Sequence, residues 1–275
     1  MKRMRCLFAI TLLSPLLAQA QHASVPGMVA PILQPGEGLA WASSDGTSKV
    51  FGEAALEAST GSLANLLWLR LDGEEWAARM VSFKCKGVLN GVRCWNPKGH
   101  GKVDLGKATL DSCNLAFFSW SMESAARWKQ DYGDGAARYR LEQVFNTFLG
   151  PRLKAGDTLP VLGPEWIGDG ELLQTTPLAM AKWLAHPDQE PLLTLCRRLM
   201  GGVFDGWITK GAEWWFITGT SPMTSLALVS TDPSKPFTWV VGSNGERAVV
   251  LHLSKGHGKG EALARMKEIL LLPKR

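Results

Sequence analysis

The order of helical and strand-like patterns along the chain is the feature that most restricts its fold. Residues 38–43 and 49–52 have the composition of two short strands, and Ser44-Asp45-Gly46 between them predicts a tight turn. Helical spacing of apolar residues then recurs near residues 59–71, 104–129, 136–148, 177–186 and 190–200. Beyond Trp207 the chain turns to β-rich runs at 214–217, 225–230, 237–241 and 248–253, followed by a helical pattern at 261–272. We therefore expect an α+β fold in which helices cover an antiparallel β-sheet.

The first twenty residues predict export. Lys2, Arg3 and Arg5 precede an apolar run, and Ala18-Gln19-Ala20 then forms a cleavage site. The run is too short for a transmembrane helix, which needs about 20 apolar residues. We therefore expect a signal peptide at residues 1–20, a mature domain at residues 21–275 that does not span a membrane, and a periplasmic location.

The net charge argues against binding of nucleic acid, and the spacing of the histidines argues against binding of a metal ion. Removing Lys2, Arg3 and Arg5 with the signal lowers the formal net charge from +5 to +2, which leaves no electrostatic footprint for nucleic acid. The five histidines have no H-E-x-x-H or other metal-ligand spacing: His22, His100, His186, His252 and His257. We therefore expect no metal and no cofactor.

Four cysteines remain in the mature chain, and an even count in an oxidising compartment favours disulfides. Cys85 and Cys94 flank Asn90-Gly91, which is a strong hairpin signal. We therefore expect a disulfide between Cys85 and Cys94. The pairing of Cys113 and Cys196 stays open, because either could be a buried thiol.

Three segments resemble, in order, parts of the penicillin-binding transpeptidase and serine β-lactamase family. Residues 57–67 are similar to the start of the nucleophile helix, where the family has Ser-x-x-Lys, so Ser59 falls on the nucleophile and Ser62 on the lysine. Residues 94–118 are similar to the family's Gly-His-Gly approach and Ser-x-Asn motif, which Ser112 and Asn114 match. Residues 167–181 resemble a helix start of the family, Ile-Gly-x-Gly-x-Leu-x-x-Thr-Pro-Leu, that carries no chemistry.

A fourth segment, Trp215-Phe-Ile-Thr-Gly-Thr-Ser, lies on a predicted strand where the family has Lys-Thr-Gly-Thr. Thr218, Gly219 and Thr220 agree with the motif, but Ile217 replaces the lysine. The resemblance spans about residues 39–272. It implies a degenerate, class D-like member of the family, with an α/β/α sandwich and an inserted, largely helical subdomain at roughly residues 72–205.

A narrower resemblance is to periplasmic proteins found alongside bacterial alpha-macroglobulin-like proteins. These share a pattern of Cys-Trp, Gly-His-Gly, Ser-Cys-Asn and Thr-Gly-Thr, which this chain has at residues 94–95, 99–101, 112–114 and 218–220. The resemblance implies a protein partner in the cell envelope, with an alpha-macroglobulin-like protein as one candidate.

Loss of both lysines predicts loss of catalysis. A serine hydroxyl needs an adjacent base, whose help is worth about 10² to 10⁴ in rate, and the hydroxyl of Ser62 cannot act as that base. Ile217 removes the positive charge that helps to hold a substrate carboxylate. We therefore expect a pseudoenzyme that binds a peptide, a peptidoglycan stem or a partner, through backbone N–H groups of Ser59 and Thr220 and through Ser112, Asn114, Thr218, Ser221, Trp214 and Trp215.

Plainer interpretations stay open. Ser59 could be only a helix N-cap, and Ser112 and Asn114 could be internally satisfied polar groups. An alternative function is an active serine acyl enzyme, such as a transpeptidase, a carboxypeptidase or a β-lactamase-like hydrolase. In it Ser112, relayed to Lys102, Lys107 or a residue distant in sequence, would activate Ser59. A third possibility is a structural subunit of an envelope complex with a closed cleft.

Overall fold

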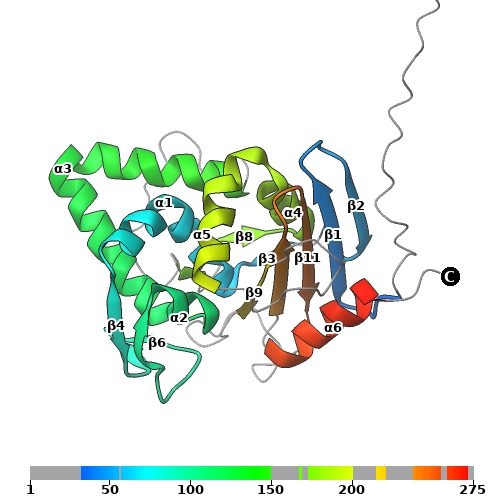
Figure 1. Cartoon of the computed structure of the whole chain (residues 1–275), viewed down its shortest axis with the longest axis horizontal. Coiled ribbons are helices and arrows are strands. Elements are labelled where there is room, and N and C mark those ends of the chain that lie inside the picture. Colours follow the sequence, from blue (N-terminus) through cyan, green and yellow to red (C-terminus); the bar gives the residue numbers. More distant parts are fainter. Residues whose placement is uncertain are drawn as a thin grey trace, which may run out of the picture. The chain divides into compact units, whose positions relative to one another are not determined.

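A five-stranded antiparallel sheet organises the chain, with strand order β2-β1-β11-β10-β9 (Figure 1). The computed structural model describes residues 32–271, apart from 56, 150–166, 169–172, 201–214, 221–237 and 255–258. These residues belong to one unit, Pro31–Leu272. The sheet consists of β1 (Glu37–Ser43), β2 (Ser48–Gly52), β9 (Trp215–Thr220), β10 (Thr238–Ser243) and β11 (Arg247–Leu253).

The first hairpin forms as its turn sequence predicts. Gly46 has a φ of 85°, a left-handed conformation that glycine adopts without steric cost. Oδ1 of Asp45 accepts hydrogen bonds from the backbone N–H and the hydroxyl of Thr47, at 2.9 and 2.7 Å. The turn therefore sets the register in which Ala42 pairs with Ser48.

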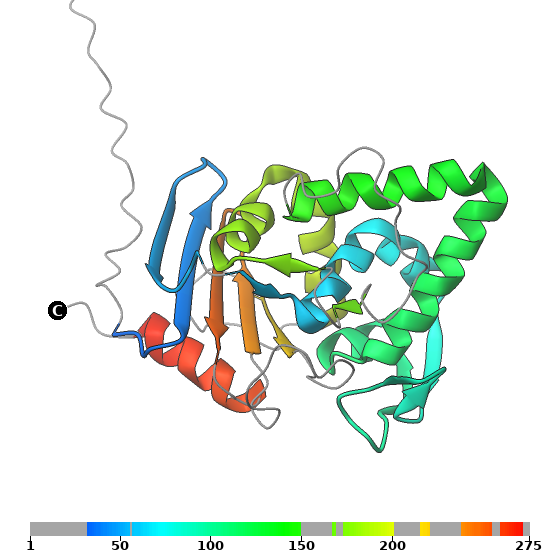
Figure 2. The same ribbon diagram turned by 180° about the vertical axis from the view of Figure 1, so that it is seen from behind.

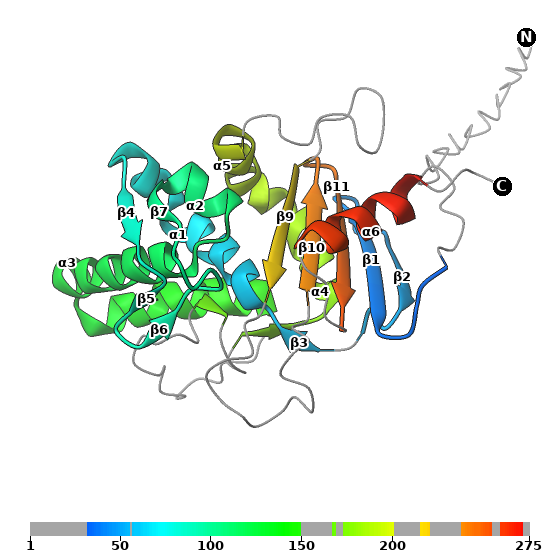
Figure 3. The ribbon, with the colours of Figure 1, turned by 90° about the horizontal axis from the view of Figure 1, so that it is seen from below.

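Helices cover both faces of the sheet. One face carries Trp239, Val241 and Val250 in the main core, together with buried residues of α4 (Pro177–Ala185). The opposite face carries Val240, Val249 and Leu251, and α6 (Lys259–Leu271) lies over it (Figure 3). Alternation of side chains along each strand separates the two apolar faces. This confirms the expected α+β fold with an antiparallel sheet between helices.

The described residues between β2 and β9 are mainly helical. Besides α4, they form η1 (Gly61–Leu63), α1 (Ala64–Ala78), α2 (Leu105–Leu110), α3 (Asn114–Leu149), η3 (Pro187–Gln189) and α5 (Glu190–Met200). Trp68 stacks between Trp76 and Trp128, with ring centroids 6.5 and 6.2 Å apart. Such pairs add about 0.5–1.5 kcal/mol each beyond the burial of their area. These tryptophans are therefore core residues.

Three short strand pairs lie outside the main sheet: β3 (Ala58–Ser59) with β8 (Gln174–Thr175), β4 (Ser82–Cys85) with β7 (Gly101–Asp104), and β5 (Val88–Leu89) with β6 (Val92–Arg93). Asn90 and Gly91 both have positive φ, 49° and 81°. This is the pattern of a type I′ turn, so the predicted Asn-Gly hairpin is confirmed.

Two helix boundaries differ from the sequence prediction. The helix expected from residue 59 starts as η1 at Gly61 and becomes α1 at Ala64. The helix expected at 104–129 is divided into α2 and α3 at residues 111–113, and it meets the helix expected at 136–148 at a kink within α3, at Gly133 with φ 79° and ψ 170° (Figure 2). The strand expected at 225–230 lies outside the described residues. No helix in the described part of the chain is both long and apolar enough to cross a membrane.

Candidate functional site

Ser59 lies at the end of β3, and Thr60 alone separates it from the first helical turn, η1. Ser59 pairs with Gln174 of the neighbouring strand β8. Gln174 lies within residues 167–181, the third of the four segments that resemble the family. The backbone N–H of Thr60 donates to the carbonyl of Leu173 at 2.7 Å. Residues 167–181, to which the sequence analysis assigned no chemical role, therefore hold Ser59, the expected nucleophile, in place.

The Ser59 hydroxyl is directed at a backbone carbonyl. Its Oγ donates to the carbonyl of Gly168 at 2.9 Å and accepts a long hydrogen bond from the N–H of Gly61 at 3.4 Å. Gly168 has a φ of 82°, and a Cβ added to it would lie 1.8 Å from the oxygen of Gly61. Only glycine fits so close an approach. Sequence reasoning missed Gly168, although its glycine is the signal that marks the position.

Trp239 connects Ser59 to the main sheet. Its indole N–H donates to the carbonyl of Ser59 at 2.8 Å, and its backbone pairs with Gly219 of β9. The first turn η1 also contacts β9. The structure therefore brings the first and fourth segments together, as the resemblance implies. Trp239 was not among the residues expected at the site.

Ser62 occupies the lysine position in η1 and is 2% exposed. A hydroxyl at this place is uncharged at neutral pH, and the next two residues, Leu63 and Ala64, belong to the main core. No basic side chain is therefore supplied by this turn of the chain.

Ser112 and Asn114 lie at the junction between α2 and α3. Ser112 has a φ of 50°, rare for a residue with a side chain, and Asn114 is the first residue of α3. Both are buried, and the Oδ1 of Asn114 has no hydrogen-bond partner among the described residues. A buried acceptor without a donor is costly, so this oxygen is a candidate for contact with a ligand.

The strand β9 is described by its backbone. Ile217, Thr218 and Thr220 pair in register with Val241, Val240 and Thr238. Trp215 opens the strand and pairs with Ser243. Trp214 and Ser221, also expected at the site, lie outside the described residues.

The two lysines considered as replacement bases differ in their surroundings. Lys107 Nζ bonds Asp111 Oδ2 at 2.5 Å, and this hydrogen bond raises the pKa of Lys107. A raised pKa makes a lysine a poorer base at neutral pH. Lys102 is exposed on β7, opposite Lys84. Neither position favours removal of a proton from Ser59.

The four cysteines that were expected to form one or two disulfides are free thiols in the structure. The expected Cys85–Cys94 disulfide is not formed, and Cys85 belongs to β4, where it pairs with Gly101, rather than to the Asn90-Gly91 hairpin. Cys85, Cys94 and Cys113 instead gather with His100, so that one ligand-type atom of each lies within 4.8 Å of the others. Three thiols and an imidazole are a set that can hold a metal ion.

The structure is similar to solved β-lactamases and penicillin-binding proteins. A class D β-lactamase from Bacillus subtilis has a TM-score of 0.54 and 15% identity, over 86% of this chain and 93% of that chain. The C-terminal domain of the Bacillus licheniformis BlaR penicillin-receptor has a TM-score of 0.53 and 12% identity, over 86% and 92%. Pseudomonas aeruginosa PBP2 has a TM-score of 0.52 and 13% identity, over 88% and 75%.

The sequence matches no protein-family model and no curated protein. Structures with identities of 12–15% show a shared fold alone, since proteins with one fold can have many different functions. At low sequence identity, the chain has the fold of class D β-lactamases and of penicillin-binding transpeptidase domains.

Proposed function

We propose that this protein is a catalytically degenerate relative of the penicillin-binding enzymes that works by binding at the region formed by Ser59, η1 and β9. The carrying observation is the Ser59 hydroxyl, which donates to the carbonyl of Gly168 at 2.9 Å. A carbonyl oxygen cannot take the proton, and the family's lysine positions hold Ser62 and Ile217. Acyl transfer therefore lacks both its base and its positive charge.

Binding groups remain although the base is gone. Buried oxygens of Thr60, Asn114 and Thr175 have no hydrogen-bond partner within the described residues. Thr60 follows Ser59, and Thr175 pairs with Ala58, so two of these oxygens belong to residues beside Ser59. Polar groups of this kind orient a ligand such as a peptide.

The ligand we propose is a peptide end, either a peptidoglycan stem or a segment of an envelope protein. The signal-like first twenty residues support a periplasmic location for this role. An alpha-macroglobulin-like protein is the partner that the narrower sequence resemblance favours. A similar fold serves a penicillin receptor as well as β-lactamases, so binding without hydrolysis is compatible with it.

The decisive experiment is intact-protein mass spectrometry after long incubation with a reactive penicillin. We expect no covalent adduct on the wild-type protein. Ser59→Ala is the matched control, because it removes the only atom on which the family's acyl group would form. An adduct on the wild-type protein that is absent from Ser59→Ala would overturn the proposal and establish the alternative, a serine acyl enzyme with an unusual base.

A binding measurement tests the positive half of the proposal. Isothermal titration with a stem peptide ending in D-Ala-D-Ala should give saturable, reversible binding. The affinity should stay within about twofold in Ser59→Ala, since the hydroxyl is already engaged with Gly168. If no peptide binds, the proposal requires an envelope protein as the ligand. In that case the wild-type protein should cross-link to an envelope protein, and Asn114→Ala should lose this cross-link.

A further inference from the structure

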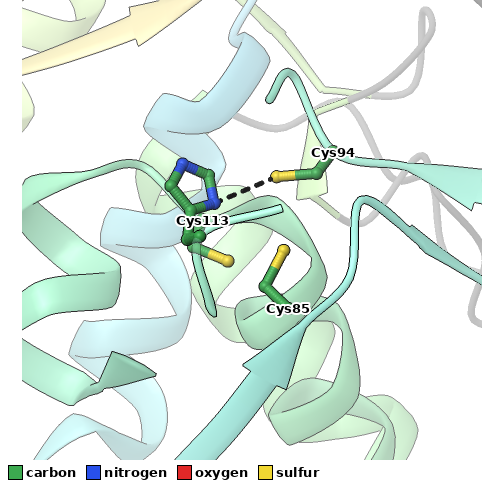
Figure 4. Close-up of side chains that lie close together, drawn as sticks. Cys85, Cys94 and Cys113 are labelled. Carbon is green, nitrogen blue, oxygen red and sulfur yellow. Dashed lines mark hydrogen bonds between the residues drawn. The ribbon is translucent and has the colours of Figure 1, made fainter. Parts of the chain in front are cut away.

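Three cysteines and one histidine from separate elements meet beside the helical core. Cys85 ends β4, Cys94 follows β6, His100 precedes β7, and Cys113 precedes α3. Cys94 Sγ lies 3.4 Å from His100 Nδ1, and all four ligand-type atoms lie within 4.8 Å of one another. Figure 4 shows the sulfur atoms pointing toward a common centre. The three cysteines are at most 5% exposed and His100 is half-buried, so the sulfur atoms are enclosed.

The spacing of these atoms suits a tetrahedral metal site. Zinc–sulfur bonds of about 2.3 Å and zinc–nitrogen bonds of about 2.0 Å place tetrahedral ligand atoms about 3.5–3.8 Å apart. The 3.4 Å between Cys94 Sγ and His100 Nδ1 is close to that range. Three thiolates and one imidazole form a closed Cys3His set, which is typical of structural zinc sites and leaves no open position for catalysis.

A disulfide explains less of the cluster. It would join two sulfurs at about 2.0 Å and leave the third thiol and the imidazole without a role. All three thiols are free in the structure, and a metal ion would use every member of the set. The fourth cysteine, Cys196, lies in α5, is fully buried and is not part of the cluster.

The loops around the cluster fix the ligands before any ion arrives. The N–H of Cys94 donates to the carbonyl of Gly87 at 2.8 Å. A Cβ on Gly87 would lie 2.1 Å from the oxygen of Pro97, and one on Gly99 would lie 2.3 Å from the oxygen of Cys85. Both glycines have positive φ, 87° and 76°. The loop after Cys85 and the loop from Cys94 to His100 are therefore clasped together, which reduces the entropy lost on binding.

The positive charge around the cluster favours thiolates. Exposed Lys84, Lys86, Arg93, Lys98 and Lys102 surround the ligands in the sequence, and no acidic residue lies between Cys85 and Lys102. Thiolate is the form that binds metal.

We propose that Cys85, Cys94, His100 and Cys113 bind one Zn²⁺ ion as a closed structural site. The thiol protons leave to solvent on binding, and no electron is transferred. This inference does not depend on the proposed function, because the ligands include none of the residues that bind or orient Ser59.

The site would also fix the segment that resembles the Ser-x-Asn motif, since Cys113 is the residue between Ser112 and Asn114. Trp95 adds a second connection on the same side. Its ring meets His100 edge-on with centroids 5.1 Å apart, and its indole N–H donates to the carbonyls of Asp111 and Ser112 at 2.9 and 3.1 Å. Binding of the ion would thus hold Ser112 and Asn114 in their buried positions.

The test is the metal content of the purified protein, prepared without a polyhistidine tag and dialysed against metal-free buffer. We expect equimolar zinc in the wild-type protein, in Cys196→Ser and in His100→Cys, which restores a four-ligand set. We expect loss of that zinc in Cys94→Ser, Cys113→Ser and His100→Ala. Equal zinc in the cluster variants and the wild type would place the metal elsewhere and overturn the proposal.

Two further measurements on the wild-type protein decide the question even where a variant fails to fold. Cobalt(II) should give the thiolate charge-transfer band and the intense visible bands of a tetrahedral thiolate site. Intact mass should equal that of the fully reduced chain. A mass lower by two hydrogen atoms, together with no bound zinc and no cobalt bands, would show a disulfide and refute the site.

Discussion

The indole N–H of Trp239 donates a 2.8 Å hydrogen bond to the carbonyl of Ser59, a residue 180 positions earlier in the chain. Trp239 is fully buried on β10, opposite Gly219 of β9 on one side and His252 of β11 on the other. The position of β3 is therefore set from the sheet as well as from β8. Trp239, which lies outside all four family-like segments, therefore holds Ser59, the residue at the family's nucleophile position.

Replacing Trp239 with phenylalanine should destabilise the protein more than the same change elsewhere in the core. Trp239→Phe removes ring volume and leaves the Ser59 carbonyl without its donor, whereas Trp128→Phe removes similar volume from an indole that has no N–H partner among the described residues. We expect an extra loss of about 1–3 kcal/mol in the free energy of unfolding, measured by urea denaturation. Equal losses in the two variants would mean that the hydrogen bond contributes nothing.

Gly168→Ala should test how tightly the segment around Ser59 is held. Gly168 and Gly46 have similar φ values, 82° and 85°, but an added Cβ meets Gly61 at 1.8 Å in the first case and nothing within 4 Å in the second. Gly46→Ala should cost about 1–2 kcal/mol, from the left-handed backbone alone. Gly168→Ala should cost about 1–3 kcal/mol more. Thermal or urea unfolding of the two variants measures the difference, which would vanish if the close approach were absent.

His252 should make the protein less stable in mild acid. Burial lowers its pKa to about 4, from an ordinary value of 6.5, so the unfolded chain binds a proton more readily than the folded one. Its contribution to stability is complete above pH 6.5 and declines as the pH falls toward 4, by a total of about 3 kcal/mol. His252→Gln should flatten the profile of unfolding free energy against pH in that window. An unchanged profile would assign the acid sensitivity to other groups.

The ion pair between Arg265 and Glu37 should contribute more to the free energy of unfolding than the ion pair between Arg265 and Glu268. Arg265 donates to both oxygens of Glu37, at 2.8 and 2.7 Å, and joins α6 to β1 where the carboxylate is 5% exposed. Arg265→Met should cost about 3–5 kcal/mol because it takes the guanidinium away from a carboxylate that is almost fully buried. Glu268→Gln removes the exposed partner of the same guanidinium and should cost at most about 1 kcal/mol. Urea denaturation of both variants at neutral pH checks the contrast.

Local chemistry made the hairpins predictable. Asp45-Gly46 and Asn90-Gly91 each determine a turn within a few residues, and β1–β2 and β5–β6 follow directly. The four motif segments indicated the fold because they include glycines and polar residues that close approaches require, such as Gly168 against Gly61. The helix start was misplaced by a few residues, since Thr60 and Ala64 flank a tighter first turn that apolar spacing does not distinguish.

The cysteine cluster could not be predicted in the same way. Its ligands are separated by eight, five and twelve residues and come from different elements, so no short spacing reveals them. The Asn90-Gly91 hairpin brings Cys94 back toward Cys85, which favoured a disulfide, but β4 pairs with β7 and brings His100 alongside. Similarly, Trp239 reaches Ser59 only through sheet register, a tertiary relationship that sequence pattern alone does not contain.

The bend at Gly133 has a consequence for how α3 opens. Its φ of 79° and ψ of 170° interrupt the ladder of backbone hydrogen bonds within the 36 residues of the helix. The first arm includes Trp120 and Trp128 of the aromatic core. Amide protons of the two arms should therefore exchange with solvent in two separate steps, with the first arm protected until the core itself unfolds.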